Sequence, residues 1–323
     1  MDRVKLEAAA DKGIIKQSQV EPLFDFLNGE VRDVSVNNSE EQLRFVRSFG
    51  DIFITLGIVF VMVAGAKIEL SSLGNIVPFL ISIASAEWLI RIRRLALPGI
   101  AILIAIIYFA SQVIGFSNAD PALHNVIILT TLGILFYWRY KMPFTLMPIA
   151  IGVISIISLL LEVDITKIQT LAIVYGLLVF STAMWFDSQD TKRQNRLSDS
   201  AFWLHLLAAP LVVHGVMSTL LTSASFSDYK EALIVAFFIV FFLIALYVDR
   251  RALLVSSLSY AIYAVIKIAN DSNQSIENLT LFVFVAFGAF IVFFGANWYT
   301  ARNIIFSKTE HTILSKFVPK YDK

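Results

Sequence analysis

The sequence contains no cysteine and few charged residues. Without cysteine the chain can form no disulfide, no thiolate metal site and no cysteine nucleophile. Charged residues are 16% of the 323 residues and the net charge is +1, so no general basic field points to nucleic acid. The phosphate-loop, nucleophile-elbow, metalloprotease, dinucleotide and haem motifs are also missing. The sequence therefore predicts no cofactor and no metal site, and nothing in it recommends an enzyme.

Apolar residues dominate instead. They make up 57% of the chain, and the mean hydropathy is +0.73, which is typical of an integral membrane protein. Ten apolar segments are long enough to cross a bilayer at roughly 20 residues each. They are residues 52–68, 75–90, 95–116, 122–138, 144–161, 168–186, 200–222, 232–248, 252–269 and 278–299. Because the connections are short, we predict an all-α, polytopic transmembrane helix bundle of about ten spans, embedded in the lipid bilayer.

Cations are distributed unevenly between the two ends of this bundle. The loops after the odd-numbered spans, with their flanks, hold Lys67, Lys167, Lys230 and Lys267. The loops after the even-numbered spans hold ten cations: Arg91, Arg93, Arg94, Arg139, Lys141, Lys192, Arg193, Arg196, Arg250 and Arg251. The positive-inside rule therefore predicts that the even loops and both termini are cytoplasmic. The tryptophans agree, since all five lie near predicted cytoplasmic helix ends: Trp88, Trp138, Trp185, Trp203 and Trp298.

Three parts are expected along the chain. Residues 1–48 form an N-terminal cytoplasmic helical segment, residues 49–300 a ten-span transmembrane domain, and residues 301–323 a cytoplasmic tail. The first 30 residues carry several charges and no continuous apolar run, so we do not expect a cleaved signal peptide. The short helices of residues 1–48 can bury little by themselves. We therefore expect this segment to dock on the membrane domain or on a cytoplasmic protein partner.

The seventh predicted span carries the polar residues that are least usual in a membrane helix. His205 and His214 are nine positions apart, so on a helix their rings face opposite sides, roughly 13 Å apart along the axis. They cannot share a metal unless Pro210 breaks the helix. Pro210 frees a backbone carbonyl, and such helices often line transport sites. One interpretation places a histidine on a proton or substrate path, and the other has a neutral histidine form an interhelical hydrogen bond.

Aspartates flank the same span on the predicted cytoplasmic side. Asp187 and Asp190 either form a cation or substrate gate, or pair with nearby cations while Ser198 or Asp199 caps the seventh span. We favour the second interpretation, in which the pairing cations are Lys192, Arg193 and Arg196. Under the first, the wall of a substrate site comprises Trp203, His205, Pro210, His214, Asp187 and Asp190.

Three further features have structural interpretations. Glu87 and Arg91 are four positions apart on one predicted helix, which favours a structural ion pair. The turn at residues 249–251, Asp-Arg-Arg, is interpreted as an anchor that sets topology. Gly288 and Gly295 are seven apart on one helix face and predict close packing, either within the chain or between chains.

Several segments carry a family resemblance. They are GII-x-x-x-QVEPLFDFL at 13–27, LRFVRSFGDIF at 43–53, SDSAFWLHLLAAPLVVH at 198–214 and DRRALLVSSLSY at 249–260. With these segments the chain resembles a family of bacterial multispan inner-membrane proteins. The resemblance implies a bacterial cytoplasmic membrane location, and it implies no activity, substrate or catalytic residue.

Three functions are consistent with these observations. The first is a permease or exporter of a small solute, with its site beside the seventh span. The second is a non-transport sensor or assembly protein that acts through its cytoplasmic tails. The third, a membrane enzyme acting on lipid, would require Asp187, Asp190 and His205 to converge on one pocket at headgroup level.

Overall fold

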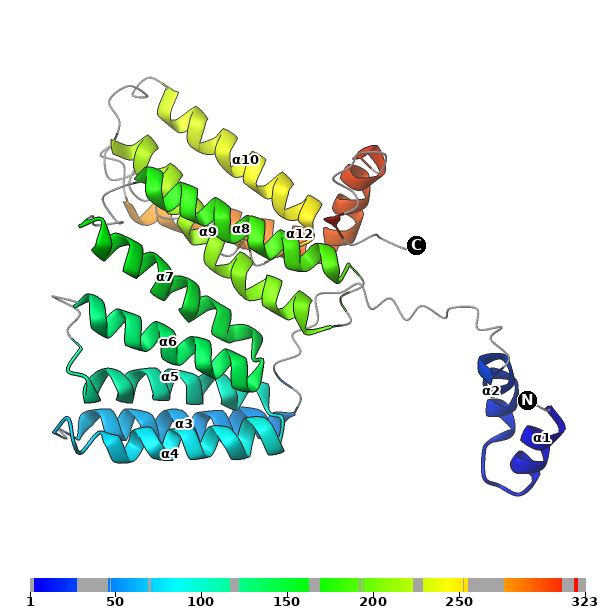
Figure 1. The fold of residues 1–323 in the computed structure, drawn as a ribbon. Coiled ribbons are helices and arrows are strands. Elements are labelled where there is room, and N and C mark those ends of the chain that lie inside the picture. Colours follow the sequence, from blue (N-terminus) through cyan, green and yellow to red (C-terminus); the bar gives the residue numbers. More distant parts are fainter. Residues whose placement is uncertain are drawn as a thin grey trace. The chain divides into compact units, whose positions relative to one another are not determined.

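The computed structural model shows helices joined by short turns (Figure 1). It describes residues 3–27, 46, 48–68, 71–116, 122–162, 169–191, 193, 195–222, 229–251, 253–254, 276–309 and 317–318. The chain separates into two compact units, residues 1–40 and residues 41–323, and each is described by itself.

The N-terminal unit contains two short helices. They are α1 (Arg3–Asp11) and α2 (Val20–Leu27), with the 3-10 turn η1 (Gln17–Gln19) before α2. Gly13 lies between them with φ of +71°, in the left-handed region that glycine adopts without a steric penalty. The helices contact each other, and Leu6 and Val20 are buried. So small a core can stabilise the unit only weakly.

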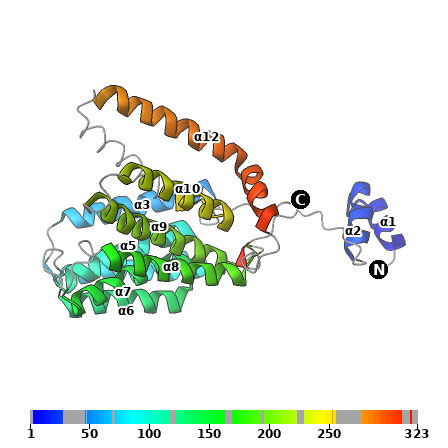
Figure 2. The same cartoon turned by 90° about the horizontal axis from the view of Figure 1, so that it is seen from above.

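The second unit is a bundle of helices in sequence order. Its elements are α3 (Phe49–Lys67), α4 (Ile76–Ala86), the π-helix η2 (Glu87–Ile92), α5 (Ala96–Val113), α6 (Leu123–Tyr140), the 3-10 turn η3 (Pro143–Thr145), α7 (Leu146–Leu160), α8 (Gln169–Gln189), α9 (Arg196–Thr222), α10 (Lys230–Val248) and α12 (Ile276–Thr309). Neighbours from α3 to α10 run back and forth, and α12 lies beside α10 (Figures 1 and 2). The predicted all-α class is confirmed, since the described residues contain no strand.

Among the residues that the structure describes, six stretches have the length and apolar composition of membrane spans. They are Phe49–Lys67, Ala96–Val113, Pro143–Leu160, Gln169–Gln189, Arg196–Leu220 and Phe284–Ile304. Large apolar side chains point away from the protein, such as Phe60 (64% exposed) and Val61 (73%) on α3, as expected where lipid is the solvent. The chain is thus a helical membrane protein. Ten spans and cytoplasmic termini stay predictions, and the ninth predicted span, 252–269, lies almost entirely outside the described residues.

Glycines allow α8 and α9 to pack closely over their length. A Cβ atom on Gly215 of α9 would lie 2.5 Å from Ile173 Cγ1 and 2.9 Å from the Gln169 carbonyl oxygen of α8. A Cβ atom on Gly176 of α8 would lie 2.8 Å from Val212 Cγ2 of α9. Small residues at such contacts bring helix backbones together. The sequence prediction had instead named Gly288 and Gly295. Within the described part of the chain no atom lies within 4 Å of either Cβ position, and their packing between chains stays a prediction.

Charged residues occupy strained positions in the turns at one end of the bundle. Arg94 (φ 57°), Lys141 (φ 51°), Arg193 (φ 52°) and Asp249 (φ 58°) all have left-handed backbones. Such a conformation costs a non-glycine residue about 1–2 kcal/mol. The four turns follow η2, α6, α8 and α10, whose C-terminal ends lie together at the right of Figure 1. This is the end that the positive-inside rule predicts to be cytoplasmic.

Candidate functional site: a buried charge cluster

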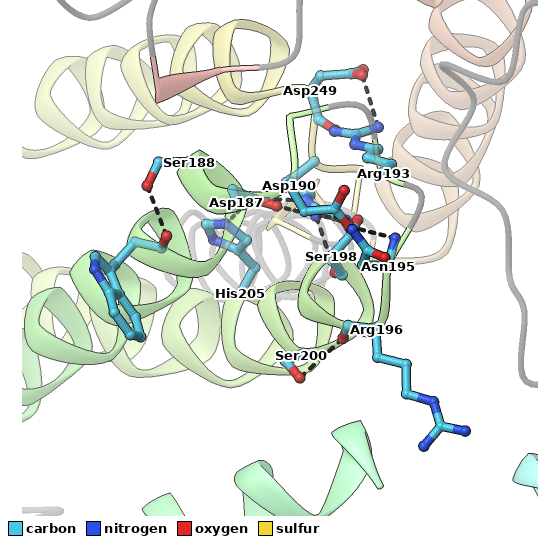
Figure 3. Close-up of polar contacts among 12 residues, drawn as sticks. Asp187, Ser188, Asp190, Arg193, Asn195, Arg196, Ser198, Ser200, His205 and Asp249 are labelled. Carbon is cyan, nitrogen blue, oxygen red and sulfur yellow. Dashed lines mark hydrogen bonds and ion pairs between the residues drawn. The ribbon is translucent and has the colours of Figure 1, made fainter. Parts of the chain in front are cut away.

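Buried ionisable side chains gather at the end of the bundle where α8, α9, α10 and α12 meet. Eight aspartate, arginine and histidine residues are buried within the described part of the chain. One is Asp51 at the start of α3. The other seven, here called the buried charge cluster, are Asp187, Asp190, Arg193, His205, Asp249, Arg250 and Arg302. Figure 3 shows Arg193 beside Asp249, with Asp187, Asp190 and His205 of the α8–α9 hairpin gathered nearby.

Asp187, near the end of α8, is the first centre of the cluster. Its carboxylate accepts hydrogen bonds from Arg250 Nη2 at Oδ1 and from Arg250 Nε at Oδ2, the latter at 3.1 Å. His205 Nε2 of α9 lies 2.9 Å from the same Oδ2. All three side chains are at most 1% exposed. Because a carboxylate facing a guanidinium is ionised and only accepts, Nε2 of His205 carries the hydrogen and donates it.

Arg250 also connects α10 to the beginning of α9. Its Nη2 donates to the carbonyl oxygen of Ser198 at 3.1 Å and to the Ser198 hydroxyl oxygen at 3.0 Å. The guanidinium therefore bonds α8 and α9 at once. A planar guanidinium with five N–H donors suits this role, whereas an ammonium has only three donors.

Asp249, at the C-terminal end of α10, is the second centre. Arg193, from the turn between α8 and α9, places Nη1 2.9 Å from Asp249 Oδ2 and donates Nη2 to its carbonyl oxygen at 2.6 Å. Trp298 of α12 donates Nε1–H to Asp249 Oδ1 at 2.7 Å, and Arg302 Nε lies 3.8 Å from the same oxygen. Three parts of the chain thus meet at one residue: the end of α10, the α8–α9 turn and α12.

The two centres are paired reciprocally: each aspartate binds an arginine from the segment that carries the other aspartate. The α8–α9 hairpin provides Asp187 and sends Arg193 to Asp249, while the end of α10 provides Asp249 and sends Arg250 to Asp187. The cluster contains three aspartates and three arginines, so its charges balance when His205 is neutral. This balance is what a buried group of charges requires, since an uncompensated charge in a low-dielectric site is expensive.

Comparisons with family models, curated proteins and solved structures find no match to the chain. The function is therefore argued from the geometry of the chain itself.

The structure brings together only part of the predicted substrate wall. Asp187 and His205 are in contact, and Asp190 Oδ2 accepts a hydrogen bond from the Asn195 backbone N–H at 2.8 Å in the adjoining turn. Trp203 packs edge-to-face on Phe144 of η3, with ring centroids 4.8 Å apart. Pro210 lies inside α9, which continues through it, and His214 is half-buried further along the helix. A cavity of about 390 Å³ lies among α5, α6 and α7, and none of the six predicted wall residues lines it.

The expected partner of Asp187 was wrong. Asp187 pairs with Arg250, 63 positions away, and with His205, whereas Arg193 reaches Asp249. The side chain of Arg196 is exposed and points away from the cluster (Figure 3), and Lys192 lies outside the described residues. The physical reason is that the end of α10 lies beside the α8–α9 turn, where Arg193 contacts Asp249, so an arginine distant in the sequence reaches Asp187.

The turn at residues 249–251 does more than the anchoring that the sequence predicted for it. Asp249 and Arg250 are buried at 3% and 1% exposure, and only Arg251 faces outward, stacked over Trp298 and Tyr299 at 5.5 and 5.4 Å. The sequence signal that could have indicated their burial was the presence of two adjacent residues of opposite charge at the end of a long apolar helix. Arg302 and the indole of Trp298 gave no sequence signal for their part in the site.

The start of α9 also differs from the prediction. The helix begins at Arg196, so neither Ser198 nor Asp199 is the residue that precedes it. The hydroxyl of Ser198 instead accepts a hydrogen bond from Arg250. The buried charge cluster therefore determines what this serine does.

Glu87 forms a second, exposed cluster at the same end of the bundle. Its carboxylate accepts from Arg91 Nη1 at 3.2 Å, as the sequence spacing suggested, and also from Arg139 Nε and Nη2 at 2.9 and 3.1 Å. The Tyr140 hydroxyl donates to it at 3.0 Å. Burial raises the pKa of Tyr140 to about 12, and the bond to Glu87 acts in the same direction, so the hydroxyl keeps its proton. No group of three or more metal-binding side chains occurs within the described ranges.

Replacing Trp298 by phenylalanine tests the contribution of α12 to the cluster. We expect Trp298→Phe to lower the free energy of unfolding by about 1–3 kcal/mol, because an aromatic ring remains while Asp249 Oδ1 loses a buried N–H donor. Denaturant titration in micelles measures this. Trp138→Phe is the matched control, since Trp138 is 70% exposed and should tolerate the change. Equal effects of the two variants would contradict the role given to Trp298.

Proposed function

We propose that the protein is a small-solute permease whose cytoplasmic gate is the buried charge cluster. On the family resemblance and the distribution of cations, we further propose that it is a ten-span protein of a bacterial cytoplasmic membrane with both termini inside. The observation that carries the proposal is the exchange of Arg193 and Arg250 between the α8–α9 hairpin and the end of α10. These two ion pairs hold the α8–α9 hairpin against α10 at one end of the bundle.

Stability alone is a weak reason for such a cluster. A buried ion pair is often no more stabilising than apolar residues of similar volume, and its best-attested uses are to set register or to switch. Ionisable residues in membrane helices usually mark solute, ion or proton paths. Asp187 and His205 lie in helices that qualify as spans. We therefore interpret the cluster as a contact that is made and broken.

The charges of the two sides suit a gate. The buried charges of the hairpin, Asp187, Asp190 and Arg193, carry a net −1, and those of α10 and α12, Asp249, Arg250 and Arg302, carry a net +1. Attraction between the sides favours the closed arrangement, and hydration of both sides favours the open one. Because attraction and hydration oppose each other, a bound solute or a proton on His205 needs to change the free-energy difference between the closed and open arrangements by only a few kcal/mol.

The absence of cysteine makes the gate testable by labelling a single introduced thiol. Ser198→Cys keeps the size of a side chain that is 6% exposed and faces Arg250. We expect slow reaction with a membrane-impermeant thiol reagent in inverted vesicles, and reaction about tenfold faster or more when Arg250→Gln is added, because breaking an ion pair weakens closure by several kcal/mol. Asn195→Cys, exposed in the turn, is the accessible control, and Ala183→Cys, buried between α8 and α9, is the inaccessible one.

Permeation itself requires a flux measurement. Proteoliposomes containing the protein should shrink and re-swell faster than empty liposomes for at least one member of a panel of small polyols, amino acids and organic acids, followed by light scattering. Arg250→Gln should change that rate. If no solute moves and Arg250→Gln leaves Ser198→Cys unreactive, the permease and the gate are both refuted.

The second candidate is a membrane protein that acts through a cytoplasmic partner. It is favoured by one observation, that residues 1–40 form a compact unit of their own. Deletion of residues 1–40 distinguishes the two functions. A permease should retain most of its flux, whereas an interaction protein should lose the partner that the full chain retains in a pull-down.

A further inference from the structure

Five exposed cations lie at the ends of η2 and α6 and in the turns that follow them, and two of the five bond to Glu87. These cations, here called the basic patch, are Arg91, Arg93, Arg94, Arg139 and Lys141. The two turns that carry them are neighbours, because Met142 Cε and Ile90 Cγ1 both lie close to the Cβ position of Gly99 at the start of α5, at 2.9 and 3.1 Å. The hydrogen bonds of Glu87 to Arg91 and Arg139 join the same two turns.

The basic patch keeps an excess of positive charge. Glu87 is the one acid bonded to it among the described residues, and four hydrogen bonds already occupy its two oxygens. One acid against five cations leaves a net +4 at a surface that is exposed. Glu87 also holds the guanidinium groups of Arg91 and Arg139 in place, so part of the patch is ordered before any anion arrives.

Indoles and apolar side chains adjoin these cations. Trp88 and Trp138 are 54% and 70% exposed, and each is next in sequence to a member of the Glu87 cluster. Arg93 lies over the Trp88 ring at 5.8 Å. Ile92 and Leu135 are 69% and 55% exposed. Exposed indoles are typical of the headgroup level of a bilayer, and exposed apolar residues suit acyl chains.

We propose that the basic patch binds the phosphate of an anionic phospholipid. The positive charge is complementary to the headgroup, and the adjoining indoles and aliphatic side chains suit the glycerol backbone and acyl chains. A free phosphate would use the cations alone and would gain nothing from the exposed Trp138 and Leu135. The proposal needs only the membrane location of the helices, so it stands or falls separately from permeation.

The test compares two variants with the same change of charge. Arg93→Gln, Arg94→Gln and Lys141→Gln together remove exposed cations that do not bond to Glu87. Lys5→Gln, Lys12→Gln and Lys16→Gln together remove the same charge from exposed positions in the N-terminal unit. Each protein is placed in bilayers doped with dibrominated phosphatidylglycerol or dibrominated phosphatidylcholine. Quenching of tryptophan fluorescence gives the ratio of the two affinities.

For the natural sequence we expect phosphatidylglycerol to be preferred by about fivefold or more, the effect of one cation or more near the surface. The patch variant should lose this preference, and the N-terminal variant should keep it. Lys141→Gln alone should reduce the preference for phosphatidylglycerol part-way. This single variant replaces the triple variant as the test if the triple variant does not fold. Equal affinities in the natural sequence, or a preference that the patch variant retains, would overturn the proposal. So would displacement of the lipid by inorganic phosphate beyond that by chloride at equal ionic strength, which would indicate a site for free anions.

Discussion

Arg250→Gln is expected to lower the free energy of unfolding by about 3–5 kcal/mol, the usual cost of removing one partner from a buried ion pair. Arg250 is 1% exposed and bonds to the Asp187 carboxylate and to both oxygens of Ser198. Its loss leaves a buried carboxylate with His205 as its remaining partner in the cluster. The measurement is denaturant titration of the purified protein in micelles, followed by fluorescence.

Removing both charges distinguishes a lost ion pair from lost packing. Asp187→Asn with Arg250→Gln should recover much of the stability, because an uncharged pair leaves no uncompensated charge. The control is Glu162→Gln, an exposed carboxylate after α7, whose effect should lie within about 0.5 kcal/mol of zero. A double variant as unstable as the two single changes added together would show that charge compensation is not what Arg250 provides.

Gly215→Ala is the second substitution with a large expected effect. The new methyl group would meet Ile173 Cγ1 at 2.5 Å and the backbone of α8 at Gln169 O and Ile173 N, at 2.9 and 3.1 Å. A side-chain atom can rotate away, but the backbone contacts can be relieved only if α8 and α9 move apart. We expect a loss of about 1–3 kcal/mol, the usual cost of overpacking. A larger residue such as leucine should prevent the pair from forming.

The same substitution should also weaken the buried charge cluster, because the contact between Asp187 and His205 joins these two helices. Faster labelling of Ser198→Cys in the Gly215→Ala background would report this. Gly288→Ala and Gly295→Ala on α12 are matched controls, since nothing lies within 4 Å of either Cβ position. They should leave stability unchanged or raise it slightly through helix propensity. A loss as large as that at Gly215 would contradict the assignment of the α8–α9 contact.

The class of the protein could be predicted from the sequence because apolar runs of span length have few alternatives in folding. The sequence also singled out Asp187 and His205, since ionisable residues are rare in such runs, and both lie in the buried charge cluster. The partner of Asp187 could not be found in this way. Charge pairing depends on which turns lie side by side, and nothing local shows that Arg250 lies against the end of α8.

Local geometry was equally hard to predict at Glu87. The spacing to Arg91 suggested one ion pair, and the structure adds Arg139 and Tyr140 from α6. The π-helix that carries Glu87 has no pattern distinct from the apolar run before it. The glycines show the same limit. Seven-residue spacing favoured Gly288 and Gly295, but whether a glycine permits close packing depends on the helix opposite it. In this chain the close contacts are at Gly176 of α8 and Gly215 of α9, which lie where these two helices pack against each other.

The exchange of arginines also imposes an order on biogenesis. Asp187 and Arg193 enter the membrane with the α8–α9 hairpin, before the residues that neutralise them have been synthesised. Arg250 follows Asp187 by 63 positions and Asp249 follows Arg193 by 56, and Trp298 and Arg302 come later still. A chain interrupted before Arg250 therefore holds aspartates and an arginine with unmet partners in its nascent bundle. The complete chain buries these same charges among their partners.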